Sequence, residues 1–252
     1  YASWRRPSSE NPYLPEGEIE KAKKEMNEDS FAQEILADFR RFTGRVYKEF
    51  DRGVHVIPPF GIPSHWTFGR YMDRGWRVPT GVGYTAIDEN DNWYVFDEIY
   101  APNLTNPELA EFVKNRQTDK YFWHSVADSA QASDLMDLEN LGVHFEPVKK
   151  EPGERQGEWI RMGITKIQER LKVGENGKPK LFIFQNCKNH IFEFENYSWD
   201  DKKDENFGFT ERPQKKNDHL LDGLRYFACE YKPGSQDLYI PEENNKNWSL
   251  TA

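Results

Sequence analysis

HWTFGRYMDRGW (residues 65–76) opens the stretch that decides the fold of this chain, and TGVGYTAIDENDNWYVFDEIYA (residues 80–101) completes it. In the second segment, apolar residues recur on both sides of the polar turn DENDN, which is typical of an antiparallel hairpin. The first segment is an apolar strand that ends at Asp73. The sequence therefore predicts three consecutive strands.

Helical and strand patterns alternate after this hairpin. The short apolar run YFWHSVAD (121–128) suits a buried parallel strand, because such strands are covered on both faces. We expect further strands at 142–148 and 180–185, and helices at 106–116, about 132–141, about 158–171, about 188–194 and about 218–231. In the first helix, Leu109, Phe112 and Val113 are expected to face inward. The order begins βββαβαβα and predicts an α/β fold in which helices flank a mixed sheet.

Residues 1–60 have a different character from the rest of the chain. They are rich in proline and charge, and they carry helical patterns at 15–26 and 29–42. Three prolines then interrupt the chain between positions 58 and 63, where regular structure is disfavoured. We interpret this segment as a helical appendage and place a domain boundary near Phe60.

Composition excludes several classes of protein. The 252 residues, 37% of them hydrophobic, suffice for one large domain or a domain plus an appendage. No segment has the roughly 18 to 20 uncharged apolar residues of a membrane span, and residues 1–15 lack a signal peptide's apolar stretch, so we expect a soluble, intracellular protein. Cys187 and Cys229 allow one disulfide at most, and neither a redox scaffold nor a structural zinc site is expected. The absence of phosphate-loop and G-x-S-x-G motifs argues against an ATPase or a covalent hydrolase.

The net charge limits the function without excluding nucleic acid as a substrate. A formal charge of −9 at pH 7 argues against a dedicated high-affinity nucleic-acid binder. Clustered carboxylates, however, add negative charge that bound divalent cations neutralise. An enzyme that brings metal to nucleic acid therefore remains compatible with this composition.

Carboxylates stand where predicted strands end and where the last helix begins. Asp73 and Asp128 close two strands, and Asp218 and Asp222 open the final helix. Ligands bind at the carboxyl ends of strands in α/β sheets, and two divalent cations about 4 Å apart can promote phosphodiester cleavage. Most of the 43 acidic residues are expected to be solvated, and we assign four of them to the hairpin turn or sheet edge: Asp88, Asp91, Asp97 and Glu98.

The final helix separates its residues into two faces. Leu220, Leu221, Leu224, Phe227 and Ala228 form an apolar stripe, opposite Asp218, His219, Asp222 and Tyr226. Gly223 lowers helix propensity by roughly 1 kcal/mol, which suggests close approach to a neighbouring element. Asp218 is expected to cap the first turn, whereas Asp222 caps nothing and is the better metal ligand. By its type alone, His219 is more often a surface or hydrogen-bonding residue than a ligand.

Several segments together resemble the large terminase subunit of tailed bacteriophages. They are NPYLPEGEIEKAKKEM and FAQEILADF near the N-terminus, the strand ending MDRG with the hairpin after it, VADSA with LGVHFEPVKK, and KNDHLLDGLRYF. The resemblance covers most of the chain, and the pattern N-D-H-x-x-D-x-x-R-Y (217–226) is its most specific part. Arg74 departs from the family's pattern, in which an asparagine or aromatic residue usually follows the first aspartate.

The resemblance implies a nuclease that cuts concatemeric double-stranded viral DNA during genome packaging, with Mg²⁺ or Mn²⁺ as cofactor and two ions bound. It implies an RNase H-like fold over residues 61–235, preceded by the linker or tail of an ATPase domain (1–60) and followed by a C-terminal tail (236–252). The implied metal ligands are Asp73, Asp128 and Asp222, with Asp218 and His219 beside the last, and His219 is counted with the catalytic residues.

The same resemblance implies partners and a location. The expected partners are double-stranded DNA, the portal protein, the small terminase subunit and the ATPase domain of the full-length chain, with no membrane involved, in the cytoplasm of the infected bacterial host. Two alternatives stay open. One is a non-catalytic module that docks DNA or the portal, and the other is a different RNase H-like nuclease such as a junction resolvase or an integrase.

Overall fold

A seven-stranded mixed sheet forms the centre of the molecule in the computed structural model, which describes residues 17, 19–21, 44–116, 121–149, 156–200, 203–204, 208–209 and 212–233. The strands of this sheet lie in the order β1-β7-β4-β3-β2-β5-β6. Their bounds are β1 Val56–Ile57, β2 Thr67–Asp73, β3 Thr80–Ile87, β4 Trp93–Ala101, β5 Phe122–Ala127, β6 Glu146–Pro147 and β7 Leu181–Phe184. Two further short strands, β8 Lys203–Asp204 and β9 Gly208–Phe209, pair with each other.

The pairing of the strands agrees with the sequence analysis. Strand β3 pairs antiparallel with both β2 and β4, so the three predicted strands and the hairpin are confirmed. Strand β5 pairs parallel with β2, as the apolar run at 121–128 predicted. The strand expected at 142–148 is shorter than predicted, because only Glu146 and Pro147 pair with β5. A proline lacks the N–H that a longer ladder would need and is tolerated at this sheet edge.

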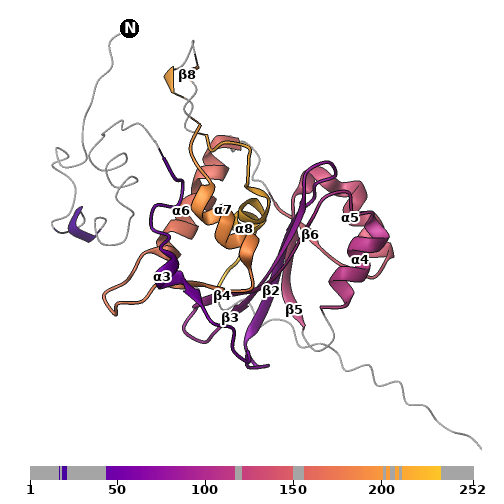
Figure 1. The fold of residues 1–252 in the computed structure, drawn as a ribbon, viewed down its shortest axis with the longest axis horizontal. Coiled ribbons are helices and arrows are strands. Elements are labelled where there is room, and N and C mark those ends of the chain that lie inside the picture. Colours follow the sequence, from indigo (N-terminus) through magenta and orange to yellow (C-terminus); the bar gives the residue numbers. More distant parts are fainter. Residues whose placement is uncertain are drawn as a thin grey trace, which may run out of the picture.

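Helices cover both faces of the sheet (Figure 1). Their bounds are α3 Arg52–His55, α4 Asn106–Lys114, α5 Ala132–Asn140, α6 Gln156–Leu171, α7 Lys188–Asn196 and α8 His219–Glu230, with a 3-10 turn, η2, at Ser129–Gln131. Helices α6, α7 and α8 lie on one face, and α4 and α5 lie on the other. The predicted helices from position 106 onward are thereby confirmed, with ends that differ by a few residues.

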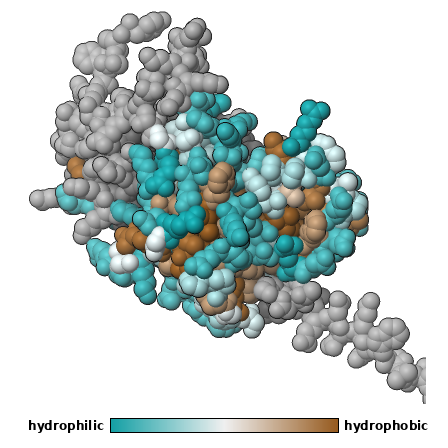
Figure 2. Space-filling model, viewed as in Figure 1, coloured by the Kyte–Doolittle hydropathy of each residue, from teal (hydrophilic) through white to brown (hydrophobic). Residues whose placement is uncertain are grey.

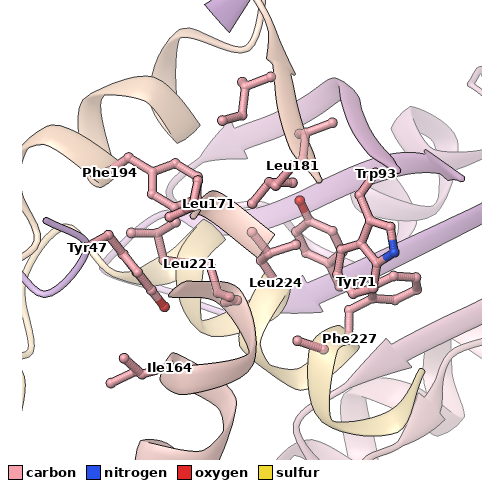
Figure 3. Packing of buried hydrophobic residues seen from close by; sticks show 14 of the residues in the cluster. Tyr47, Tyr71, Trp93, Ile164, Leu171, Leu181, Phe194, Leu221, Leu224 and Phe227 are labelled. Carbon is pink, nitrogen blue, oxygen red and sulfur yellow. The ribbon is translucent and has the colours of Figure 1, made fainter. Parts of the chain in front are cut away.

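Each face of the sheet has its own hydrophobic core, because successive side chains of a strand point to opposite faces. Tyr71 of β2 packs on the side of α8, and Met72 packs on the side of α4 and α5. Figure 3 shows Tyr71, Leu224 and Phe227 packed together where α8 crosses the sheet. This packing places the first turns of α8 over the end of β2, where Asp73 lies.

Helix α4 differs from its prediction at one position. Thr105 and Glu108 form the reciprocal hydrogen bonds of a capping box at its start, and Leu109 and Val113 are buried as expected. Phe112 is 42% exposed, so the expectation that it faces inward is wrong. Leu109 and Val113, four residues apart, share the buried face, whereas Phe112 lies three residues after Leu109 at the edge of that face.

Residues that precede Phe60 contribute to the sheet and its core. Strand β1 pairs parallel with β7, and Tyr47 and Phe50 pack against Phe194 of α7. The core therefore extends N-terminal of the predicted boundary, and the division of the chain at Phe60 stays a prediction. The helices expected at 15–26 and 29–42 fall outside the described residues, apart from a short helical piece at 19–21.

The described surface is mainly polar. Figure 2 shows hydrophilic side chains over most of the visible face, with apolar side chains between them. Within the part of the chain that the structure describes, every helix is too short or too polar to cross a bilayer.

Candidate functional site

Asp73 and Asp128 leave neighbouring strands at the same edge of the sheet. Asp73 is the last residue of β2, and Asp128 follows the last residue of β5. These strands are parallel, with Met72 opposite Ala127 in the register. The carboxyl ends of two adjacent strands therefore bring both carboxylates to one edge, as the sequence analysis expected.

Helix α8 reaches this edge because two glycines leave room for it. A Cβ atom on Gly223 would lie 2.9 Å from the Tyr71 ring and 3.6 Å from the backbone nitrogen of Asp73. A Cβ atom on Gly81, which pairs with Asp73 in the sheet, would lie 3.1 Å from the backbone of His219. The close approach predicted for Gly223 is confirmed.

His219 contacts Asp73 directly. Its Nδ1 lies 3.2 Å from Asp73 Oδ2, and the two side chains are 16% and 19% exposed. The hydrogen bond to Asp73 raises the pKa of His219, because a nearby carboxylate favours the charged imidazolium. His219 is therefore a partner of the first carboxylate rather than an isolated surface histidine.

Tyr226 connects the remaining carboxylates. Its hydroxyl donates a hydrogen bond of 3.4 Å to Asp128 Oδ2. Burial raises the pKa of Tyr226, and the charges of Asp222, Asp73 and Asp128 raise it further. One hydroxyl thus experiences all three predicted ligands, which lie around it. The structure therefore brings together carboxylates that stand 55 and 94 positions apart in the sequence.

Asp222 is held by an ion pair on its own helix. Arg225 Nη2 lies 3.0 Å from Asp222 Oδ1, and the Arg225 guanidinium stacks over the rings of Trp159 and Tyr226. Burial raises the pKa of Asp222, Arg225 opposes that shift, and the charge of Asp73 adds to it. Trp159 is buried against this arginine, so its predicted packing role is confirmed.

Asp218 does not cap α8, which corrects the sequence analysis. Asp218 occupies the N-cap position, but its side chain makes no capping hydrogen bond. Glu193 of α7 takes this role, because its Oε2 accepts the N–H groups of Leu220 (2.9 Å) and Leu221 (3.0 Å). The Asp218 carboxyl is instead part of the acidic cluster, where burial and the charge of Asp222 raise its pKa to about 6.

Gln131 ties the two strand ends together. Its side-chain amide donates to the carbonyl of Arg74 (2.7 Å) and accepts the N–H of Arg74 (3.2 Å). Arg74 follows Asp73 directly, and Gln131 lies three residues after Asp128. The Arg74 guanidinium donates to Thr80 and to the start of α4, so this residue braces the site from behind.

These residues fit a pair of hard divalent cations. Asp73, Asp128, Asp218 and Asp222 offer carboxylate oxygens, the ligands that Mg²⁺ and Mn²⁺ favour. The raised pKa values of Asp218 and Asp222 show that the acidic groups repel one another, and divalent cations relieve such repulsion. Ligands shared between two ions about 4 Å apart also need not lie within one narrow shell.

A second cluster combines Glu98, Cys187 and His190, whose potential ligand atoms lie within 4.8 Å of one another. Hydrogen bonds account for it without a metal. Glu98 accepts from the backbone and ring of His190, and the other ring nitrogen of His190 lies 2.8 Å from the Tyr71 hydroxyl. Glu98 is therefore a buried cap of α7, and its assignment to the hairpin surface is wrong. We assign no metal to this cluster.

Sequence reasoning missed Glu193, Gln131 and the Glu98 cluster. The C-x-x-H spacing of Cys187 and His190 was a usable signal for the last of these. Glu193 lies between aromatic residues in FEFEN, a pattern that indicates a strongly apolar helix but not which carboxylate turns inward. Gln131 follows a strand end like any loop residue and gives no local signal.

Comparison with known proteins confirms the resemblance to large terminase subunits. The chain is 26% identical over 226 residues to the large terminase subunit of Escherichia phage T5, which covers 86% of this chain and 49% of that protein. The chain therefore spans about half the length of this curated relative. No family model matches the chain.

Solved structures show the same likeness. A full-length large terminase from a thermophilic bacteriophage matches with a TM-score of 0.71 and 23% identity over 89% of this chain and 55% of that one. The nuclease domain of the P22 large terminase matches with a TM-score of 0.56 and 19% identity, covering 73% of this chain and 90% of that domain. The large terminase nuclease of thermophilic phage G20c gives 0.54 and 14%, covering 74% and 98%. The predicted RNase H-like architecture is confirmed.

Proposed function

We propose that this homologue of large terminase subunits is a metal-dependent endonuclease that cuts concatemeric double-stranded viral DNA during genome packaging. One observation carries the proposal. Asp73 of β2, Asp128 after β5 and Asp222 of α8 converge on one edge of a sheet that has the fold of terminase nuclease domains. The G20c nuclease has also been solved with cobalt bound (TM-score 0.51, 12% identity), which supports a divalent cation as cofactor.

The four carboxylates are the proposed ligands of two Mg²⁺ or Mn²⁺ ions, with Asp73, Asp128 and Asp222 as the main ones and Asp218 beside them. Two such ions activate water and stabilise the leaving oxygen in phosphodiester cleavage. The chain's own groups orient the ligands. His219 holds Asp73, Tyr226 holds Asp128, and Arg225 holds Asp222. Such hydrogen bonds to ligands set their direction and basicity.

The partners of the full-length protein follow from the same proposal. The chain matches about half of the phage T5 subunit, and the thermophilic phage terminase with the TM-score of 0.71 has also been solved in complex with ADP. We place an ATPase domain before this chain, with residues 1–60 as its tail or linker. The portal protein, the small terminase subunit and double-stranded DNA are the proposed partners in the cytoplasm of the infected host.

Substitution of Asp73 tests the proposal. Asp73→Ala removes a ligand without opening a cavity in the core, so we expect Mn²⁺-supported plasmid cleavage to disappear while the protein stays folded. Asp137→Asn on the exposed side of α5 is the matched control and should cleave at the wild-type rate. Wild-type cleavage by Asp73→Ala would exclude Asp73 from the site.

The two alternatives give different results in the same assay. A non-catalytic docking module would leave plasmid DNA intact at every Mn²⁺ or Mg²⁺ concentration. A junction resolvase or integrase would prefer branched DNA to linear or supercoiled duplex. Cleavage of plain duplex that depends on a divalent metal supports the terminase nuclease over both.

A further inference from the structure

The loop between β2 and β3, residues 74–79, begins one residue after Asp73. Three consecutive side chains at its tip, Trp76, Arg77 and Val78, are exposed to solvent. Trp76 is 56% exposed and Val78 is 50% exposed. A single exposed apolar residue is ordinary in soluble proteins. Two of them flanking a cation, at the rim of a proposed active site, require a closer look at how the loop is held.

The base of this loop is braced by side-chain and backbone hydrogen bonds. The hydroxyl of Thr80 donates to the carbonyl of Gly75 (2.7 Å), which also accepts from the guanidinium of Arg74 (2.9 Å). The carbonyl of Trp76 accepts the N–H of Asn103 (2.8 Å). The loop backbone is therefore positioned by three different elements, and its direction relative to Asp73 is determined.

Gly75 makes the tight turn possible. A Cβ atom at this position would lie 2.5 Å from the carbonyl oxygens of both Val78 and Pro79, which no side chain tolerates. The chain folds back on itself here and projects the tip outward. Trp76 is therefore held exposed on a braced loop, and it does not pack into either hydrophobic core.

Charge supports a polyanionic partner for this tip. Arg74 is committed to internal hydrogen bonds, whereas Arg77 is exposed and makes no ion pair within the described part of the chain. With a net charge of −9, the protein needs local cations near the acidic cluster to hold a phosphate backbone. Arg77 lies four residues from Asp73 and meets this requirement.

We propose that the 74–79 loop is a DNA-positioning element, in which Arg77 binds a backbone phosphate and Trp76 packs against the sugar and base edges in the adjacent minor groove. Arginines contact phosphates and aromatic side chains pack on bases, and both contacts tolerate sequence variation. Such contacts away from the cleaved bond hold the reacting phosphate in place. This inference rests on the nuclease function proposed above.

The test measures DNA affinity separately from cleavage. Fluorescence anisotropy with a labelled duplex is recorded in the Asp73→Ala background, where DNA stays intact. Trp76→Ala should weaken binding by about 5-fold to 100-fold at every salt concentration, with an unchanged salt slope. Arg77→Ala should weaken binding and reduce the slope of log K against log salt by about 1. The exposed residues Phe192 of α7 and Arg52 of α3 provide matched controls, Phe192→Ala and Arg52→Ala, which should bind like the parent.

A spectroscopic readout distinguishes contact from an indirect effect on structure. Adding duplex should quench part of the tryptophan fluorescence, and the conservative variant Trp76→Phe should lose that part while retaining most of the affinity. Affinities of Trp76→Ala and Arg77→Ala within about twofold of the parent, with unchanged quenching in Trp76→Phe, would overturn the proposal.

The outcome for the loop is separable from the outcome for the nuclease. A wild-type chain that binds duplex but never cleaves it would refute the proposed function, and the variant affinities would still decide the role of the loop. A wild-type chain without measurable affinity for duplex DNA would overturn both. The Mn²⁺-induced rise in melting temperature should be the same in Trp76→Ala as in wild type, because the loop tip holds no proposed ligand.

Discussion

Asp218 and Asp222 stand four residues apart on α8 and have different surroundings. Asp222 forms an ion pair with Arg225, and its charge acts on Tyr226 together with those of Asp73 and Asp128. Asp218 has no capping hydrogen bond and lies beside the same cluster. Both carboxylates therefore belong to one electrostatic unit, and Asp222 is the one that α8 presents to the strand ends.

Asp222→Asn should reduce Mn²⁺-supported cleavage by at least about 100-fold, because even groups that only orient a ligand cost 10-fold to 100-fold. Asp218→Asn should retain much of the activity. It should also leave the metal-free protein as stable as wild type or raise its free energy of unfolding by up to about 1 kcal/mol, since a repelled carboxylate is removed and no cap is lost. Plasmid cleavage and thermal melting check both results. An inactive Asp218→Asn beside an active Asp222→Asn would place the metal one helical turn earlier.

Gly223 shows how one missing methyl group controls the distance between two elements. Gly223→Ala gains about 1 kcal/mol of helix propensity, but its Cβ would meet the buried Tyr71 ring at 2.9 Å. Overpacking of this kind costs about 1 to 3 kcal/mol, so we expect a net loss of stability and slower cleavage, because Asp222 is displaced with the helix.

Gly157→Ala provides the control for this prediction. Gly157 lies near the start of α6 with nothing within 4 Å of a Cβ atom, so the same substitution should be neutral or stabilising by up to about 1 kcal/mol. Chemical denaturation measures both variants. Equal effects of the two substitutions would show that the α8 contact with β2 does not limit the approach.

At the scale of elements, α7 and α8 are joined through a buried charge. Burial raises the pKa of Glu193 from 4.5 to about 7, against the lowering effect of the hydrogen bond from Leu221. A carboxylate whose folded pKa exceeds its unfolded pKa contributes stability below pH 4.5, and this contribution is lost as the pH rises through 7. The junction between the two helices should therefore weaken with increasing pH.

Glu193→Gln tests this junction, because the amide oxygen can still accept the two N–H groups of α8. The free energy of unfolding of the variant relative to wild type should increase by about 3 kcal/mol between pH 4.5 and pH 8 in the absence of metal. Glu195→Gln on the same helix is the control. The exposed ion pair with Arg52 lowers the pKa of Glu195, so its contribution is present at high pH and is lost on acidification. A flat pH profile for Glu193→Gln relative to wild type would refute the assignment.

The elements themselves were largely predictable, because local patterns encode them. Alternation around DENDN predicted the hairpin, and the apolar stripe of the last helix placed it against the sheet. Strand β1 and helix α3 were missed, since elements of two and four residues carry no periodicity. Strand ends and the helix face predicted the carboxylate positions. Glu193 was missed because its partners come from another helix 27 positions away, and no local pattern reports such a contact.

At the scale of the whole molecule, charge and the residues behind the site set the conditions for DNA cleavage. The net charge of −9 opposes the approach of a polyanion, and divalent cations at the carboxylates reverse that locally. The described structure holds the ligands through contacts within its own sheet and helices, Gln131 and Glu193 among them. Positioning of the ligands therefore needs no second domain.

The last prediction is that this chain cleaves duplex DNA without ATP and with little sequence preference. The sequence contains no phosphate loop, so ATP has no recognisable site through which to stimulate the reaction. It also carries no zinc module, and we expect contacts mainly to the phosphate backbone, which carry no sequence information. Cleavage of a long linear DNA with Mn²⁺ should give a smear, unchanged by added ATP, and it should fall steeply between about 50 and 200 mM salt. Discrete bands would reveal base recognition, and stimulation by ATP would show that nucleotide binds within these 252 residues.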